Sequence, residues 1–256
     1  MKSLAQKAYM LLVYGLLYFP ILVLIAYSVN NARFSLQWHG FSTQWYQELL
    51  HDQSLWSALF HSVYLGLTAS CIATITGLLA CVYLFLHPDY KRYRSFYSTL
   101  LLLIIIPDLV LGVALLIFFN ITATPLGFVS LLIAHITFCI PFVVLTINSR
   151  IHTLDVNIYA SALDLGASRF TALTRILFPL LWPAISSAFL LCFTLSFDDV
   201  IISYFVAGPD FNILPLTIYS LVRTGVTPEL NALCTMTFLI SMVLVILSYR
   251  LSRKSI

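Results

Sequence analysis

The chain has 256 residues, of which 61% are hydrophobic and 9% are charged, and its formal net charge is +3. Because charged residues make up about 25% of an ordinary soluble domain, a soluble fold would have too little surface charge to stay dispersed in water. The small net charge and the lack of a long lysine or arginine run disfavour nucleic-acid binding, and the apolar content excludes a disordered chain. The composition therefore indicates a membrane protein that crosses the bilayer several times.

Six stretches are apolar over the roughly 20 residues that a helix needs to cross the hydrocarbon core. In chain order they are 8–29, 55–86, 96–119, 126–148, 181–207 and 230–249. The first is longer than the apolar core of a signal peptide and lacks a small-residue cleavage site, so we expect it to remain as a helix. The second is long for one crossing and is expected to tilt or to extend beyond the bilayer. The sequence thus predicts one all-α transmembrane domain of six helices over residues 1–256.

Basic residues are unevenly distributed among the segments that join these spans. With both termini placed inside, 11 of the 13 lysines and arginines fall in inner segments, and only Arg33 and Arg223 fall outside. Cytoplasmic segments of membrane proteins carry such an excess of positive charge. We therefore expect both termini to be cytoplasmic and the number of spans to be even.

The cysteines and histidines do not indicate a metal site. All five cysteines fall inside predicted spans and none forms a Cys-x-x-Cys pair, so they are interpreted as small buried hydrophobes; they are Cys71, Cys81, Cys139, Cys192 and Cys234. The histidines are scattered, and His135 lies inside the fourth span. There we expect it to form a hydrogen bond across the helix bundle rather than to bind a metal.

Residues 30–54, between the first two spans, are predicted to lie on the outer side. They contain Trp38, Trp45 and Tyr46 among polar residues, and Trp56 follows at the start of the second span. Aromatic side chains of this kind sit at the level of the lipid headgroups. We therefore expect a loop or a short amphipathic helix at the outer membrane interface.

Residues 150–179, predicted on the inner side, are too polar to cross the membrane but have a helical pattern. Asp155 can cap a helix over residues 159–165. Gly166 then stands where a residue in the left-handed conformation usually ends a helix. The pattern predicts a short helix that ends at a glycine.

A second short helix is predicted to begin at Ser168 and to end at Pro179, before the fifth span starts. The pair of helices would project into the cytoplasm with Leu163, Phe170 and Leu173 exposed. Apolar side chains held out on ordered helices are typical of a surface that binds another protein.

The sequence of residues 159–179, YASALDLGASRFTALTRILFP, resembles the EAA-type loop of ABC importer permeases. That pattern is Glu-Ala-Ala, three residues, Gly, nine residues, Ile, one residue and Leu-Pro. Ala162, Gly166, Ile176 and Pro179 match it in spacing, whereas Ala160, Ser161 and Phe178 replace its glutamate, its first alanine and its leucine. The resemblance implies that the loop seats in a groove of a cytoplasmic ATPase and transmits its closure to the membrane. The coupling residues would be Ala160, Ser161, Ala162, Leu163, Gly166, Ala167, Phe170, Ile176 and Pro179.

The resemblance extends from about residue 10 to residue 250. The segments LLIAHITFCIPFVV, FTLSFDDVIISYFVAGP and ILPLTIYSLVRTGVTPELNAL are similar to permease subunits of spermidine/putrescine ABC importers, as are YFPILVLIAYSVNNARFS and FSTQWYQELL. This resemblance implies the type I ABC importer permease fold in a bacterial inner membrane and transport by alternating access. It also implies a second homologous permease subunit, two copies of an ATPase that bind ATP and Mg, and a periplasmic polyamine-binding protein. The chain itself would hold no cofactor and would not be an enzyme.

Three carboxylates lie at membrane depth, Asp108 in the third span and Asp198 and Asp199 in the fifth. Each costs about 2.5–3.5 kcal/mol at a helix centre unless it faces a partner or water. A substrate with several ammonium groups gives a reason for them, because carboxylates can replace the hydration that it loses. Adjacent helical residues point about 100° apart, so at most one of Asp198 and Asp199 would face the pathway squarely.

Other residues could assist the aspartates in binding a cation, and the aspartates also have a structural alternative. Tyr204 and Tyr219 offer ring faces for cation–π contacts, and the outer acids Asp210 and Glu229 would add a weaker, salt-screened attraction. The alternative is that each membrane aspartate serves structure, by hydrogen bonds to neighbouring helices or to a partner subunit. Asp108 would then cap the backbone groups that are freed where Pro107 kinks its helix. The sequence leaves both alternatives open, and it does not distinguish spermidine from putrescine.

Three rival functions are weaker. The inner loop argues against a passive cation channel, which would need no cytoplasmic docking surface. Acidic residues in the pathway would repel an anionic solute. An intramembrane aspartyl protease would carry Tyr-Asp and Gly-x-Gly-Asp motifs, which the third and fifth spans lack. Because the chain contains no GxxxxGK[ST] motif, nucleotide hydrolysis would require another chain.

Overall fold

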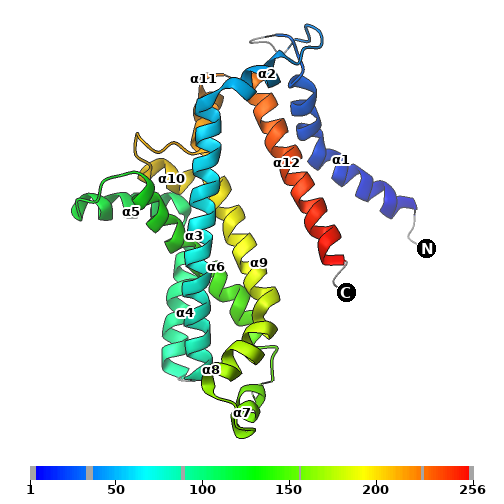
Figure 1. Cartoon of the computed structure of the whole chain (residues 1–256). Helices are drawn as coiled ribbons and strands as arrows, with labels where there is room; N and C mark the ends of the chain where they lie inside the picture. Colours follow the sequence, from blue (N-terminus) through cyan, green and yellow to red (C-terminus); the bar gives the residue numbers. More distant parts are fainter. Residues whose placement is uncertain (1–3, 33–36, 88–89, 156, 226–227, 254–256) are drawn as a thin grey trace. The chain divides into compact units, whose positions relative to one another are not determined.

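The computed structural model describes residues 4–32, 37–87, 90–155, 157–225 and 228–253, and it is predominantly helical (Figure 1). Within these ranges, the side chains of residues 4, 5, 90, 92, 224, 240, 241 and 243–253 are not described. The chain forms two compact units, one from residues 1–56 with 217–256 and one from residues 57–216. Each unit is treated by itself below.

The first unit contains α1 (Leu4–Tyr27), α2 (Gln44–His51) and α12 (Pro228–Arg253). Both α1 and α2 pack against α12. α1 is apolar on all sides and its side chains are mostly exposed, as expected for a helix whose neighbours are lipids or other subunits. α2 is amphipathic and buries Trp45 and Leu49, and the Trp45 indole donates a hydrogen bond of 2.8 Å to the Asn30 carbonyl. Of the loop and the short amphipathic helix expected as alternatives between the first two spans, the helix is present.

The second unit is built on α3 (Gln53–Leu86), α6 (Phe128–Ile151) and α9 (Phe178–Asp198). The thiol of Cys139 donates to the Cys192 carbonyl at 3.7 Å, and the thiol of Cys192 donates to the Cys139 carbonyl at 3.6 Å. These small side chains let α6 and α9 approach closely. The thiol of Cys81 in α3 donates to a carbonyl of α6 in the same way.

The prediction of five buried cysteines is correct for Cys81, Cys139 and Cys192, whereas Cys234 is half-buried and Cys71 is exposed. Position within an apolar span does not say which side of the helix faces the core. Cys71 is exposed on α3, and for that residue the prediction is wrong.

Two of the predicted spans are broken. In the third, α4 (Tyr90–Ile105) and α5 (Asp108–Ile121) meet at 105°, because Pro107 lacks an N–H and cannot continue the helix. In the fifth, α9 ends at Asp198 and a separate short helix, α10 (Ile201–Val206), follows. The expectation of one helix over residues 181–207 is therefore wrong. α11 (Leu214–Thr224) leads from the second unit back to the first.

Four of the described helices are long and apolar enough to cross a membrane, and the bent pair α4–α5 gives a fifth span if it counts as one. The sixth predicted span, 230–249, coincides with α12, most of whose side chains beyond Leu239 lie outside the described residues. The count of six spans therefore stays a prediction. The orientation also stays a prediction, and Lys2, Arg33 and Lys254, on which it partly depends, lie outside the described residues.

Candidate functional site

The first part of the candidate site is the break between α9 and α10. Asp199 has an extended backbone conformation there, and its carboxylate accepts three hydrogen bonds from the first turn of α10. Oδ1 accepts the N–H of Ile202 at 3.3 Å, and Oδ2 accepts the N–H and the hydroxyl of Ser203, each at 2.8 Å. Asp199 therefore caps α10 and satisfies backbone donors that the break would otherwise leave unpaired.

His135 of α6 joins this break to the helix bundle. Its ring is fully buried. Nδ1 lies 2.7 Å from the Ser196 hydroxyl oxygen, and Nε2 lies 3.0 Å from the Ser203 hydroxyl oxygen. Nε2 is also 3.8 Å from Oδ2 of Asp199, whose side chain is 9% exposed. The hydrogen bond predicted for His135 across the bundle is thus confirmed, and it connects α6 to the end of α9 and to the start of α10.

The other two membrane aspartates are differently placed. Asp198, the last residue of α9, and Asp108, the first residue of α5, are both exposed. Among the described residues, no other residue forms a hydrogen bond with either side chain. The first turn of α5 has no side-chain cap, so the alternative that Asp108 caps the backbone freed by Pro107 is not observed.

The three aspartates lie at the two helix breaks that precede α5 and α10, and these two helices pack against each other (Figure 1). The contact is close because Gly112 of α5 has no side chain. A Cβ atom at Gly112 would lie 2.8 Å from the ring of Phe205 and 3.3 Å from the Cα of Ile202. Chain segments about 90 residues apart in sequence are thereby held together.

The two tyrosines differ in their surroundings. Tyr204 of α10 is 54% exposed, and its ring meets Phe205 edge-on with centroids 5.6 Å apart. Tyr219 of α11 stacks under the chain's own Arg223, whose guanidinium carbon lies 4.9 Å from the ring centroid. Tyr219 and Glu229 belong to the first unit, whereas Asp108, Asp198 and Asp199 belong to the second.

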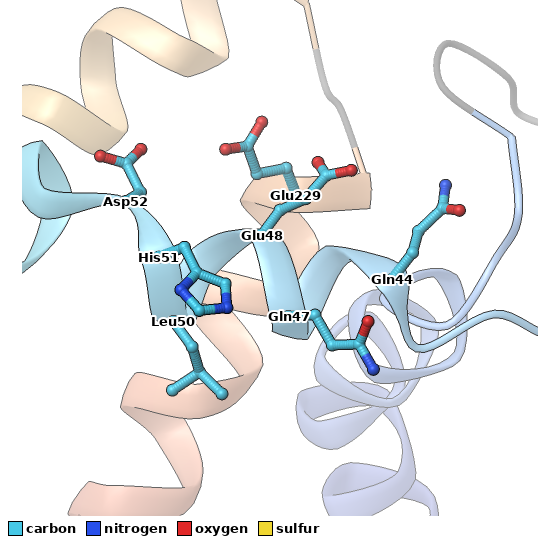
Figure 2. A pocket seen from close by; sticks show the side chains of 7 residues that line it. All are labelled: Gln44, Gln47, Glu48, Leu50, His51, Asp52 and Glu229. Carbon is cyan, nitrogen blue, oxygen red and sulfur yellow. The ribbon is translucent and has the colours of Figure 1, made fainter.

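Glu229 instead lines an open pocket of about 790 Å³ between α2 and α12 in the first unit (Figure 2). The lining residues are Gln44, Gln47, Glu48, Leu50, His51, Asp52 and Glu229. The carboxylates of Glu48, Asp52 and Glu229 point to the same side of α2 in Figure 2. One oxygen of Asp52 also accepts the N–H groups of Ser54 and Leu55 at 2.8 and 3.2 Å.

The sequence prediction missed the α2 side of this pocket. Gln44, Gln47, Glu48 and His51 recur at helical spacing opposite the buried Trp45 and Leu49, so a polar face was recognisable from the sequence. What the spacing could not show is that Glu229, about 180 residues later, lies beside that face. Asp210, the other outer acid, is exposed and belongs to the second unit.

The inner segment forms α7 (Asn157–Asp164) and α8 (Arg169–Ala172). Asp155 Oδ1 accepts the N–H of Asn157 at 2.9 Å, and the Ser168 hydroxyl accepts the N–H of Thr171 at 3.1 Å. Gly166, between the helices, has φ +87°, in the left-handed region. Both predicted caps and the predicted glycine conformation are confirmed.

The predicted end of the second helix at Pro179 is wrong. A π-helical turn, Leu173–Leu177, joins α8 to α9, so residues 169–198 form one continuous helix of 30 residues. Pro179 is the second residue of α9 and follows the π-helical turn directly. The continuous helix turns Leu173 toward the core of the second unit, so Leu173 is not the exposed side chain that was expected.

The exposed apolar side chains of this segment are Leu165 and Phe170, at 89% and 75%. The sequence analysis did not predict the exposure of Leu165. Leu163, which was predicted to be exposed, is half-buried. Of the other proposed coupling residues, Ala160, Ser161, Gly166 and Pro179 are exposed, Ala167 and Ile176 are half-buried, and Ala162 is buried. Ala162 is covered because α7 packs against α8 and the π-helical turn.

Comparison with known proteins agrees with this architecture. Residues 73–255 match the family described as binding-protein-dependent transport system inner membrane component. The chain is 44% identical over 251 residues to the spermidine/putrescine transport system permease protein PotC of Escherichia coli strain K12, covering 98% of this chain and 94% of the relative. It is 38% identical over 233 residues to the putrescine transport system permease protein PotI of the same strain, covering 89% and 83%.

A crystal structure of a bacterial ABC transporter involved in the import of the acidic polysaccharide alginate contains a similar chain. The TM-score is 0.70, the sequence identity is 16%, and the match covers 99% of this chain and 98% of the other. At this identity the likeness shows the fold alone, which is that of an ABC importer permease.

Proposed function

The chain belongs to the family of binding-protein-dependent transport system inner membrane components, and from this premise we propose that it is the permease subunit of an ATP-driven importer of polyamines, spermidine or putrescine or both. As a family member it is a multi-pass transport subunit of the inner membrane and not an enzyme. The observation that carries the proposal is the placement of Asp108 and Asp198 at two helix breaks whose following helices pack together. Two relatives, at 44% and 38% identity, are polyamine transport permeases by name.

The proposed pathway uses the three aspartates in two ways. Asp199 is committed to the cap of α10, so Asp198 and Asp108 are the carboxylates that remain to contact the cation. A polyamine that enters loses water from its ammonium groups, and these carboxylates replace part of that hydration. Tyr204, whose ring is exposed on α10, adds a cation–π contact, whereas Tyr219 would have to exchange its stacking on Arg223 for one with substrate.

The pocket between α2 and α12 is proposed to act earlier. Glu48, Asp52 and Glu229 place three carboxylates around one opening on the side expected to face the periplasm. These three carboxylates would raise the local concentration of a polycation, an attraction that salt weakens. The pocket would thus concentrate substrate or favour docking of the polyamine-loaded binding protein.

Leu165 and Phe170 are proposed to seat in the cytoplasmic ATPase. Two bulky apolar side chains at 89% and 75% exposure are costly in water and suit a groove in a partner protein. The assembly would contain a second homologous permease, two ATPase copies that bind ATP and Mg, and a periplasmic polyamine-binding protein. Closure of the ATPases would drive alternating access, and both termini would be cytoplasmic.

Reconstitution tests this function. The chain is assembled with its neighbouring permease, ATPase and binding protein in liposomes, and uptake of radiolabelled spermidine and putrescine is measured with and without ATP. ATP-dependent uptake is expected, with a loss of about tenfold or more for Asp198→Asn and for Asp108→Asn, since hydrogen bonds to charged groups contribute about 1.5–3 kcal/mol. Asp210→Asn, which removes an exposed outer carboxylate, is the matched control and should change uptake little at physiological salt.

Two results would overturn the proposal. Wild-type uptake in the well-expressed Asp108→Asn/Asp198→Asn double variant would remove the role of the pathway carboxylates. Sustained flux without ATP or without the ATPase would instead favour a passive cation channel.

A further inference from the structure

The hydrogen bonds around His135 form a chain with a single direction. The Ser203 hydroxyl has one hydrogen, and it donates that hydrogen to Oδ2 of Asp199 at 2.8 Å. Its contact with Nε2 of His135 at 3.0 Å must therefore be one in which Nε2–H donates. In a neutral imidazole the other nitrogen is then an acceptor, so the Ser196 hydroxyl donates to Nδ1 at 2.7 Å.

This chain runs from α9 through α6 to α10 and ends on the Asp199 carboxylate. Each of its members is at least nine-tenths buried, so no bulk water is available to replace a lost bond. A carboxylate with 9% exposure is stable only where hydrogen bonds take over from its hydration. The Asp199 cap and the position of His135 therefore depend on each other.

We infer that His135 is a positioning residue for substrate passage: through Ser203 it holds the Asp199 carboxylate on the first turn of α10, and it thereby fixes the break at which Asp198 contacts the substrate. The inference rests on the proposed function. His135 itself is fully buried and does not contact the substrate. Its role is to keep α9 from continuing past Asp198 and to keep α10 starting at Ile201.

Two variants at one position separate positioning from simple packing. His135→Leu fills the space but removes both hydrogen bonds, whereas His135→Gln retains a side-chain donor and acceptor. His61→Leu is the matched control, because His61 also hydrogen-bonds through its ring, to the Asn212 carbonyl at 2.9 Å, but is only half-buried and stacks on Phe211. All three are made in the complete reconstituted transporter.

The first measurement is amide hydrogen exchange of residues 200–206 in the absence of polyamine. His135→Leu is expected to raise exchange of the α10 amides about tenfold or more, because the cap on the Ile202 and Ser203 N–H groups is loosened. His135→Gln and His61→Leu are expected to leave it within about twofold of wild type. Unchanged exchange in His135→Leu would overturn the inference.

The second measurement is the number of polyamine molecules transported per ATP hydrolysed. A lower amount of assembled transporter reduces the rate of transport and the rate of ATP hydrolysis by the same factor. The ratio of the two rates therefore reports a defect in the transport pathway and does not change with the folding yield. The ratio should fall about tenfold in His135→Leu and recover in His135→Gln. Adding Asp199→Ala to His135→Leu should not lower the ratio further, because the two residues belong to one hydrogen-bond network and their effects are not additive. Adding Asp108→Asn to His135→Leu should lower the ratio again, because Asp108 lies outside that network.

The two hypotheses fail in different ways. If the wild-type assembly moves no polyamine, the proposed function is wrong, and hydrogen exchange alone then decides whether His135 holds α10. If wild type transports polyamine and His135→Leu transports as many polyamine molecules per ATP as wild type, the inference about His135 is wrong. It is also wrong if the His135→Leu/Asp199→Ala double variant loses as much as the product of the two single losses.

Discussion

Nε2 of His135 and Oδ2 of Asp199 lie 3.8 Å apart, and the hydroxyl of Ser203 is within hydrogen-bonding distance of both atoms. Asp198, one residue earlier, has no such connection and is exposed at the end of α9. Two carboxylates that are adjacent in sequence therefore have different surroundings. The difference predicts that they respond differently to substitution.

Replacing the two aspartates should separate stability from transport. Asp199→Ala removes the cap of α10 and should lower the stability of the assembled transporter by about 1–2 kcal/mol, seen as earlier thermal unfolding by intrinsic fluorescence. Asp198→Asn should leave thermal unfolding unchanged and lower polyamine uptake. Equal thermal unfolding in the two variants would contradict the distinction between a cap and a substrate ligand.

The pocket between α2 and α12 should have a salt-dependent effect. Glu48→Gln with Glu229→Gln removes two of its three carboxylates while keeping side-chain size. Uptake should fall at about 10 mM salt, where the screening length is about 30 Å, and should approach wild type at about 1 M, where it is about 3 Å. Gln47→Ala, in the same pocket but without a charge change, is the control. A defect that persists at high salt would point to a direct contact instead.

Phe170 should be an anchor for the ATPase. Phe170→Ala is expected to weaken association of the purified ATPase with the permease by about 2 kcal/mol, or roughly 30-fold, as buried aromatic anchors commonly do. Leu173→Ala should instead lower the stability of the permease itself, because Leu173 packs against the core of the second unit. Binding is measured by titration of the ATPase onto nanodisc-held permease, and stability by thermal unfolding. Normal ATPase affinity in Phe170→Ala would place the docking surface elsewhere.

Glycine is required at position 166 because of the backbone conformation there, and not because a side chain would clash with a neighbouring atom. It has φ +87°, and a Cβ atom there would meet no other atom within 4 Å. Gly166→Ala should therefore cost about 1–2 kcal/mol from strain alone, and Gly166→Asn should cost less because asparagine adopts this conformation more readily. The comparison is made by thermal unfolding and by ATP-coupled uptake. Equal costs for the two variants would show that a steric contact, and not the dihedral angle, sets the requirement.

The sequence predicted well those features that local chemistry decides. Pro107 marked the bend between α4 and α5, Gly166 marked the left-handed residue, and Asp155 and Ser168 marked caps that the structure confirms. Each depends on a missing N–H, a missing Cβ or a side-chain acceptor within three residues. No distant part of the chain is needed to form them.

The features that were missed depend on distant contacts. No proline or glycine marks the break after Asp198, which the hydrogen bonds of Asp199 and His135 support from within the folded bundle. Pro179 suggested an end to the second coupling helix, but the π-helical turn at Leu173–Leu177 carries the helix past it. That continuation in turn places Leu173 against the core of the second unit.

The continuous helix from Arg169 to Asp198 has a geometric consequence for how the chain can vary. With no joint between its ends, the number of residues sets the angular phase of Asp198 about the helix axis relative to Phe170, as well as their separation. One inserted residue would turn the acidic end by about 100° and lengthen the helix by about 1.5 Å. This stretch should therefore accept substitutions on its lipid-facing side far more readily than any change in length.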